Sequence, residues 1–199
     1  MTRTNCPALR QAMLVLAASC LTGVIGCKQA ERSAQQPAET TARQATIELR
    51  SEAFSEGRPI PARHTGDGED LSPPLSWSGL PEGARELALI ADDPDAPSGD
   101  WVHWVVYKIP VNVKALKEGV PRSQELSELA GALQGRNSRG TTGYHGPAPP
   151  PGKPHRYFFK LYALDAGLDL KPGLTKEELL GAISGHILAQ GQLMGTYQR

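Results

Sequence analysis

Residues 86–97 read Glu-Leu-Ala-Leu-Ile-Ala-Asp-Asp-Pro-Asp-Ala-Pro, an apolar run that passes directly into an acidic turn. A short apolar run bounded by turn residues is typical of a strand buried on both faces. Pro94 and Pro97 stiffen the turn, because the proline ring holds φ at about −65°. The stretch therefore predicts a buried β strand that ends beside two carboxylates, Asp93 and Asp95.

Other segments on either side of this run also predict strands. Apolar residues, alternating or continuous, occupy 46–49, 73–77, 102–109 and 157–164, and an extended segment covers 59–61. Glycine and proline turns separate these segments. Strands divided in this way indicate a mostly antiparallel β domain.

One helix is indicated near the C-terminus. Residues 175–178 read Thr-Lys-Glu-Glu, a capping box that begins a helix. Helical spacing predicts that one face of it holds Leu179, Ile183, His186 and Ile187. A second short helix is predicted over 126–133.

The first 26 residues predict a secretory signal. Arg3 and Arg10 supply positive charge, and the apolar run at 12–21 is too short to span a bilayer. Val-Ile-Gly-Cys at 24–27 resembles the cleavage site of bacterial lipoproteins. The resemblance implies a lipoprotein signal peptide over 1–26, cleavage before Cys27 and lipidation of that cysteine. An ordinary cleaved signal is the alternative.

The segment after Cys27 has the composition of a tether. Residues 28–45 contain no large apolar residue and are rich in Gln, Ala, Glu, Thr and Arg. A lipidated flexible tether is therefore predicted over 27–45, and the folded domain over 46–199. Residue 28, directly after the predicted lipidated cysteine, is a lysine. By resemblance to proteobacterial lipoproteins, a residue other than aspartate at this position favours sorting to the outer membrane. The expected location is the bacterial cell envelope, with the domain facing the periplasm.

The composition restricts the classes of partner. The chain has 21 basic and 21 acidic residues and a formal net charge of zero, so nucleic acid is not expected as a partner. Its three cysteines are Cys6, Cys20 and Cys27, and the first two lie in the predicted signal. The domain beyond Cys27 therefore cannot form an internal disulfide and depends on its hydrophobic core for stability.

A histidine lies near the start of the strand that follows the acidic turn. His103 belongs to the apolar run 101–106, and a period of two predicts that it shares a face with Val105 and Tyr107. An antiparallel neighbour begins where the preceding strand ends, so His103 and Asp93 are expected at one edge of the sheet. The alternatives are a structural buried histidine and aspartates that only cap their own turn.

A second histidine, His155, opens the last predicted long strand, after the proline-rich run 147–151. By alternation His155 and Tyr157 share a face, whereas Arg156 points the other way, toward a carboxylate. Imidazoles beside backbone N–H groups can hold a phosphate-like anion. These residues favour a small anion site at the sheet's edge.

Other site chemistry has little support in the sequence. Asp93 and the two histidines offer an alternative metal site, but no HxH, HxxxH or CxxC motif is present, so no metal or cofactor is predicted. No Gly-x-Ser-x-Gly motif or glycine-rich nucleotide fingerprint occurs either. We therefore expect a protein that is not an enzyme, and a hydrolase that uses Asp93 and His103 as acid and base remains a lesser alternative.

Two sequence blocks carry a family resemblance. The first is Asp-Pro-Asp-Ala-Pro at 93–97 with His-Trp at 103–104, and the second runs from Gly143 to Phe159. Both resemble the signature blocks of the phosphatidylethanolamine-binding protein family, and most closely its bacterial Raf-kinase-inhibitor-like branch. The resemblance covers residue 47 to the C-terminus. It implies a large antiparallel sheet packed on a smaller one, one or two short helices near the C-terminus, and a small cavity at the sheet's end.

The resemblance also implies particular roles for residues. Those implied to line an anion pocket are Asp93, His103, Pro149, Pro150, His155 and Tyr157, and those implied to support it are Asp95 and Arg156. The expected function is non-catalytic binding of phosphate, a phospho-headgroup or a carboxylate, with membrane attachment through Cys27. The alternative is an inhibitor-like interaction protein of the envelope, whose unidentified partner would contact an exposed loop at 134–144.

Overall fold

A computed structural model of the chain describes residues 45–199. The predicted signal peptide, Cys27 and the tether as far as residue 44 lie outside the described residues. The first strand, β1 (Ala45–Thr46), begins one residue before the predicted start of the domain.

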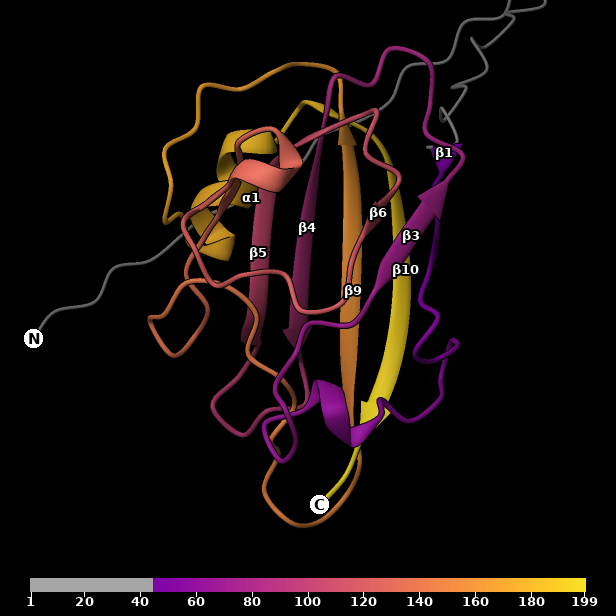
Figure 1. Ribbon diagram of the computed structural model, residues 1–199, viewed down its shortest axis with the longest axis vertical. Helices are drawn as coiled ribbons and strands as arrows, with labels where there is room; N and C mark the ends of the chain where they lie inside the picture. The colour runs from indigo at the N-terminus through magenta and orange to yellow at the C-terminus, as the bar shows by residue number, and fades with distance from the viewer. Residues whose placement is uncertain (1–44) are drawn as a thin grey trace, which may run out of the picture. The chain divides into compact units, whose positions relative to one another are not determined.

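The larger of two sheets has seven strands in the order β1-β10-β9-β4-β5-β8-β7. Its central strands, β10, β9, β4 and β5, lie side by side in Figure 1. Apart from β1, its strands are β4 (Glu86–Asp93), β5 (Trp101–Pro110), β7 (Glu125–Leu126), β8 (Ala132–Gln134), β9 (His155–Leu164) and β10 (Ile187–Tyr197). Every neighbouring pair is antiparallel except β1 with β10. The predicted mostly antiparallel β class is confirmed, although the strand β10 was not foreseen.

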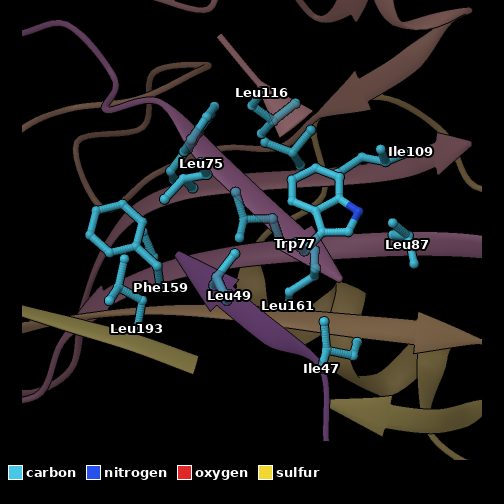
Figure 2. Close-up of a cluster of buried hydrophobic side chains, with 14 of the residues drawn as sticks. Ile47, Leu49, Leu75, Trp77, Leu87, Ile109, Leu116, Phe159, Leu161 and Leu193 are labelled. Carbon is cyan, nitrogen blue, oxygen red and sulfur yellow. The ribbon is translucent and has the colours of Figure 1, made fainter. Parts of the chain in front are cut away.

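The smaller sheet has three strands in the order β2-β3-β6, and it packs on one face of the larger sheet. These strands are β2 (Glu48–Arg50), β3 (Leu75–Ser78) and β6 (Ala115–Leu116). Buried side chains from both sheets meet between them (Figure 2), including Leu49, Leu75, Trp77, Leu87, Phe159 and Leu161. The predicted strand 46–49 is split at buried Ile47, so β1 joins the larger sheet and β2 the smaller.

The helix α1 (Lys176–Ile183) covers part of the opposite face of the larger sheet. Its Thr175 capping box is present, as predicted. Leu179 and Ile183 are fully buried in a cluster that includes Ile90, Val105 and Tyr107. Complete burial of a Leu or Ile side chain stabilises the fold by about 1.5–3 kcal/mol. Within residues 45–199 no helix combines the length and hydrophobicity needed to cross a membrane.

Both helix predictions need correction. α1 stops at Ile183, because Gly185 takes a φ of +84°, so His186 and Ile187 do not lie on its face and Ile187 begins β10. The predicted helix over 126–133 is wrong. That segment holds one 3-10 turn, η2 (Ser127–Leu129), and then left-handed backbone at Ala130 leads into β8. Another 3-10 turn, η1 (Ala62–His64), precedes β3.

The outer edge of β10 is covered by the segment that leads from β1 toward η1. The backbone N–H groups of Ile47 and Gly57 donate to the carbonyls of Gln190 and Met194 at 3.0 and 2.8 Å. This pairing occupies an edge that would otherwise be open to another strand. It also brings the chain so close that a Cβ on Gly191 would lie 2.2 Å from the Ile47 carbonyl oxygen.

Gly191→Ala should therefore lower the free energy of unfolding by about 1–3 kcal/mol, because the covering segment must move away from β10. Gly181→Ala is the matched control, since nothing lies within 4 Å of its Cβ position. Alanine is a better helix former than glycine, so the control should raise stability by about 0.5–1 kcal/mol. Urea denaturation measures both, and equal effects would contradict the close packing at Gly191.

Candidate functional site

The register of β4 brings three chain segments to one end of the larger sheet. β4 pairs with β5 through Asp93 opposite Trp101, and with β9 through Asp92 opposite Phe158. β4 therefore ends where β5 and β9 begin, at the lower end of the sheet in Figure 1. A cavity of about 380 Å³ lies at this end. Its lining includes all six residues proposed for the pocket, namely Asp93, His103, Pro149, Pro150, His155 and Tyr157.

A β-bulge places His103 in this cavity. Ala91 pairs with Trp104 and Asp92 with Val102, so His103 is the extra residue of β5. The predicted alternation is therefore wrong here: Val102, rather than His103, packs in the same cluster as Val105. The His103 ring instead lies 5.2 Å from the Tyr157 ring, in an edge-to-face arrangement. Bulges commonly re-aim a side chain in this way.

His103 is buried, with one ring nitrogen bonded and the other unpaired. Its Nδ1 lies 2.5 Å from the His145 carbonyl oxygen, and the residue is only 5% exposed. Burial lowers the pKa of His103 to about 4, so the ring is neutral at pH 7. Within the described residues, His103 Nε2 and the Tyr157 hydroxyl have no hydrogen-bond partner. Burial, followed by the nearby charge of Asp93, raises the pKa of Tyr157.

Asp93 both caps its turn and orients a histidine. Its Oδ1 accepts the backbone N–H of Asp95 at 2.8 Å, as a turn-forming aspartate would. Its Oδ2 lies 2.8 Å from Nδ1 of His155, on the neighbouring strand. Asp93 thus caps its turn and also holds the His155 ring.

Asp95 and Arg156 join the acidic turn to β9. Arg156 Nε and Nη2 donate to the two Asp95 oxygens at 2.9 and 2.8 Å, and the Arg156 backbone N–H adds a third bond at 2.9 Å. The Arg156 guanidinium lowers the pKa of Asp95 to about 2. Neither residue belongs to the cavity lining. The two residues thus hold the acidic turn against β9 from outside the cavity.

The loop at 144–150 forms a wall of the cavity and packs on the segment 62–70. The Tyr144 hydroxyl donates to the His64 carbonyl at 2.7 Å, and Gly66 N–H donates to the Pro147 carbonyl at 2.8 Å. Gly146 is required by this contact, because a Cβ there would lie 2.6 Å from the His64 carbonyl oxygen. Pro149 is buried in the wall, and Pro150 is exposed at its rim.

Two lining residues, His145 and Arg139, were not assigned to the pocket from the sequence. His145 Nδ1 lies 3.2 Å from Asp70 Oδ2, and the same carboxylate pairs with Arg122. Although burial acts against it, Gly146 N–H and Arg122 lower the pKa of Asp70. His145 lies within the quoted block 143–159, but strand alternation gives no direction for a side chain in a loop.

The loop at 134–144 is not the exposed loop that was expected. Gln134, Asn137 and Tyr144 are buried, and exposure is confined mainly to residues 138–141. Asn137 Oδ1 accepts the backbone N–H groups of Arg139 and Thr141 at 3.0 and 3.2 Å. The loop is thus held in shape and carries Arg139 to the cavity.

The chemistry of the site is that of hydrogen bonding by imidazole, phenol, carboxylate and guanidinium groups. Among residues 45–199, no set of three or more His, Cys, Asp or Glu side chains is arranged to hold a metal ion. Two residues of the cavity lining, His103 and Tyr157, carry buried polar atoms without a partner among the described residues, a feature expected of a small-ligand site.

The structure defines a class of mostly antiparallel β proteins, with two packed sheets and a cavity at one end of the larger sheet. The family model described as phosphatidylethanolamine-binding protein matches residues 50–198. The chain belongs to this family.

Similar proteins and solved structures support the same family assignment. A UPF0098 protein of Methanothermobacter thermautotrophicus is 52% identical over 153 residues, which cover 77% of this chain and 99% of that protein. The crystal structure of a phosphatidylethanolamine-binding protein homologue from Chlamydia trachomatis is 44% identical with a TM-score of 0.70, and the match covers 78% of this chain and 99% of that one. E. coli YbcL, described as a new member of the mammalian PEBP family, is 32% identical with a TM-score of 0.72 and the same coverage.

Acid should destabilise the protein through His103. Its folded pKa of about 4 lies below the ordinary value of 6.5, so between these limits the unfolded chain binds more protons and stability falls as the pH falls. From pH 7 to 5 this residue alone should remove about 2 kcal/mol. His103→Asn keeps a donor for the His145 carbonyl but cannot titrate. Urea denaturation in piperazine buffer should show a smaller loss for the variant, and an equal loss would contradict the assignment.

Proposed function

We propose that the protein is a non-catalytic binding protein whose cavity takes a small ligand bearing a phosphate, a phospho-headgroup or a carboxylate. The observation that carries this proposal is the pair of buried, unpaired polar atoms in the cavity wall, His103 Nε2 and the Tyr157 hydroxyl. A buried polar group without a partner costs about 1–3 kcal/mol, and a bound ligand that pairs with it offsets that cost.

The charges around the cavity favour an anionic group on the ligand. The lining includes Arg139, whose side chain has no ion-pair partner among the described residues. Guanidinium groups recognise carboxylates and phosphates through paired hydrogen bonds. The single carboxylate in the lining, Asp93, is already bonded to His155 and to the turn. The volume of about 380 Å³ suits a small molecule.

The contacts of the candidate acid and base support binding rather than turnover. In a hydrolase, Asp93 and His103 would each have to exchange a proton with the substrate or a water. Asp93 instead bonds to His155, and His103 Nδ1 bonds to the His145 carbonyl. We therefore expect a screen of phosphate and carboxylate esters to show no turnover.

Calorimetric titration of the purified full-length protein with inorganic phosphate and with phosphoethanolamine tests this function. We expect saturable binding that His103→Ala and Tyr157→Phe each weaken about tenfold, because each change removes a polar contact. His186→Ala is the control, since this exposed histidine pairs with Asp165 and does not line the cavity. Equal binding by the wild type and His103→Ala, or no binding at all, would refute the proposed pocket.

We also propose that the chain is anchored in the bacterial envelope through a lipidated Cys27, with the domain facing the periplasm from the outer membrane. The support is the sequence of residues 24–28 and the positively charged, apolar segment before it. Several acyl chains on one residue would anchor the protein stably, because each buried methylene contributes about 0.8 kcal/mol.

Cys27→Ser should therefore move the protein from the membrane fraction to the soluble fraction when the gene is expressed in a Gram-negative host. Substitution of Cys20, which lies in the predicted signal, is the control and should leave the protein in the membrane fraction. Density-gradient separation then assigns the inner or outer membrane. Unchanged membrane association of Cys27→Ser would contradict the lipid anchor.

A further inference from the structure

Three histidines of the cavity wall share one arrangement. His103 Nδ1 faces the His145 carbonyl, His145 Nδ1 faces Asp70, and His155 Nδ1 faces Asp93, at 2.5, 3.2 and 2.8 Å. All three rings line the same cavity. The His103 and His145 rings are nearly parallel, with centroids 6.3 Å apart.

The partners of the three Nδ1 atoms decide where the protons lie. Carbonyl and carboxylate oxygens only accept hydrogen bonds, so each Nδ1 must carry the donated proton. In a neutral ring the proton on Nδ1 leaves Nε2 with a lone pair. Among the described residues none of the three Nε2 atoms has a hydrogen-bond partner. His103 and His145, whose pKa values burial lowers, therefore each present an unprotonated Nε2 that can accept a hydrogen bond from a ligand.

Burial keeps His103 and His145 neutral, against the attraction of the carboxylates around them. His103 faces Asp92 and Asp93 from β4, Tyr157 from β9 and His145 from the loop. Desolvation outweighs these carboxylates and lowers the pKa of His103.

The pKa of His145 also reflects burial acting against the attraction of a carboxylate. It faces Asp70, Arg122 and Arg139, and burial, ahead of the attraction of Asp70, lowers the pKa of His145. His155 faces Asp93, with Asp95 nearby. An anion that is only an acceptor would meet lone pairs at His103 and His145, and these repel it.

We propose that the cavity binds a phosphomonoester together with a proton, and that His145 is a third ligand-binding imidazole beside His103 and His155. This rests on the proposed function and specifies its ligand chemistry. The extra proton comes from the solvent. It occupies the hydrogen bond between a phosphate oxygen and the Nε2 of one of these histidines, and either of the two atoms can carry it. In both placements the complex holds one proton more than the separate phosphate dianion and neutral protein. Phosphate monoesters suit this exchange because their second pKa is about 6.

Calorimetry with methyl phosphate tests the proposal on the full-length protein. Titrations at pH 8.0 in Tris and in HEPES, which differ in ionisation enthalpy, measure the number of protons taken up on binding. We expect an uptake of about one proton. Affinity should fall about tenfold per pH unit between pH 7.5 and 8.5, because one bound proton gives that slope by linkage. Binding without proton uptake and with the same affinity across this range would overturn the proposal while leaving the proposed function intact.

His145→Asn separates the role of this imidazole from a structural one. The variant keeps a donor for Asp70 and the backbone carbonyl that holds His103, but loses Nε2. We expect affinity at pH 7.5 to fall by about three- to tenfold and the proton uptake to decrease. His186→Asn is the matched control, because its Nδ1 also pairs with a carboxylate, Asp165 at 2.8 Å, away from the cavity. Unchanged proton uptake in His145→Asn would remove His145 from the site.

Discussion

The antiparallel pairing of β4 with both β5 and β9 is the constraint on which the site depends. Residues 87–90 are fully buried between the two packed faces, and a slip of one residue would move every one of these side chains to the opposite face. In this register Asp93 meets the start of β5 and lies 2.8 Å from His155, which is 62 residues away in the chain. The packing of the core thus positions Asp93 and His155. The loops at this end of the sheet complete the wall of the cavity.

Within that frame, hydrogen-bond acceptors set the chemistry of the cavity. The bulge in β5 turns the His103 ring toward Tyr157, and the His145 carbonyl then holds its Nδ1. Asp93 and Asp70 hold two more imidazoles in the same way. Fixing one nitrogen of each ring leaves the other for a ligand, as fixed second-nitrogen bonds do wherever histidine orientation matters. These bonds determine which hydrogen-bond donors and acceptors the cavity of this protein presents.

Regular alternation in the sequence predicted most of the fold, and departures from regularity account for the errors. The apolar runs located β4, β5 and β9, and alternation placed His155 and Tyr157 together, since periodicity reports burial directly. The face of His103 was predicted wrongly, because a bulge depends on the partner strand and leaves no local signal. β10 was missed since its alternation is interrupted by Gly191 and Gly195, whose role is to admit neighbouring groups closely. His145 and Arg139 lie in loops, where only long-range contacts such as Asp70 with Gly146 determine direction.

The nitrogen-15 chemical shifts of the imidazoles, measured by NMR on the ligand-free protein at pH 7, test the central claim most directly. They show which ring nitrogen of each histidine carries a proton. We predict that His103 is neutral, with its proton on Nδ1 and an unprotonated Nε2. A proton on Nε2 in the ligand-free state would contradict the fixed orientation from which the binding chemistry of the cavity is derived.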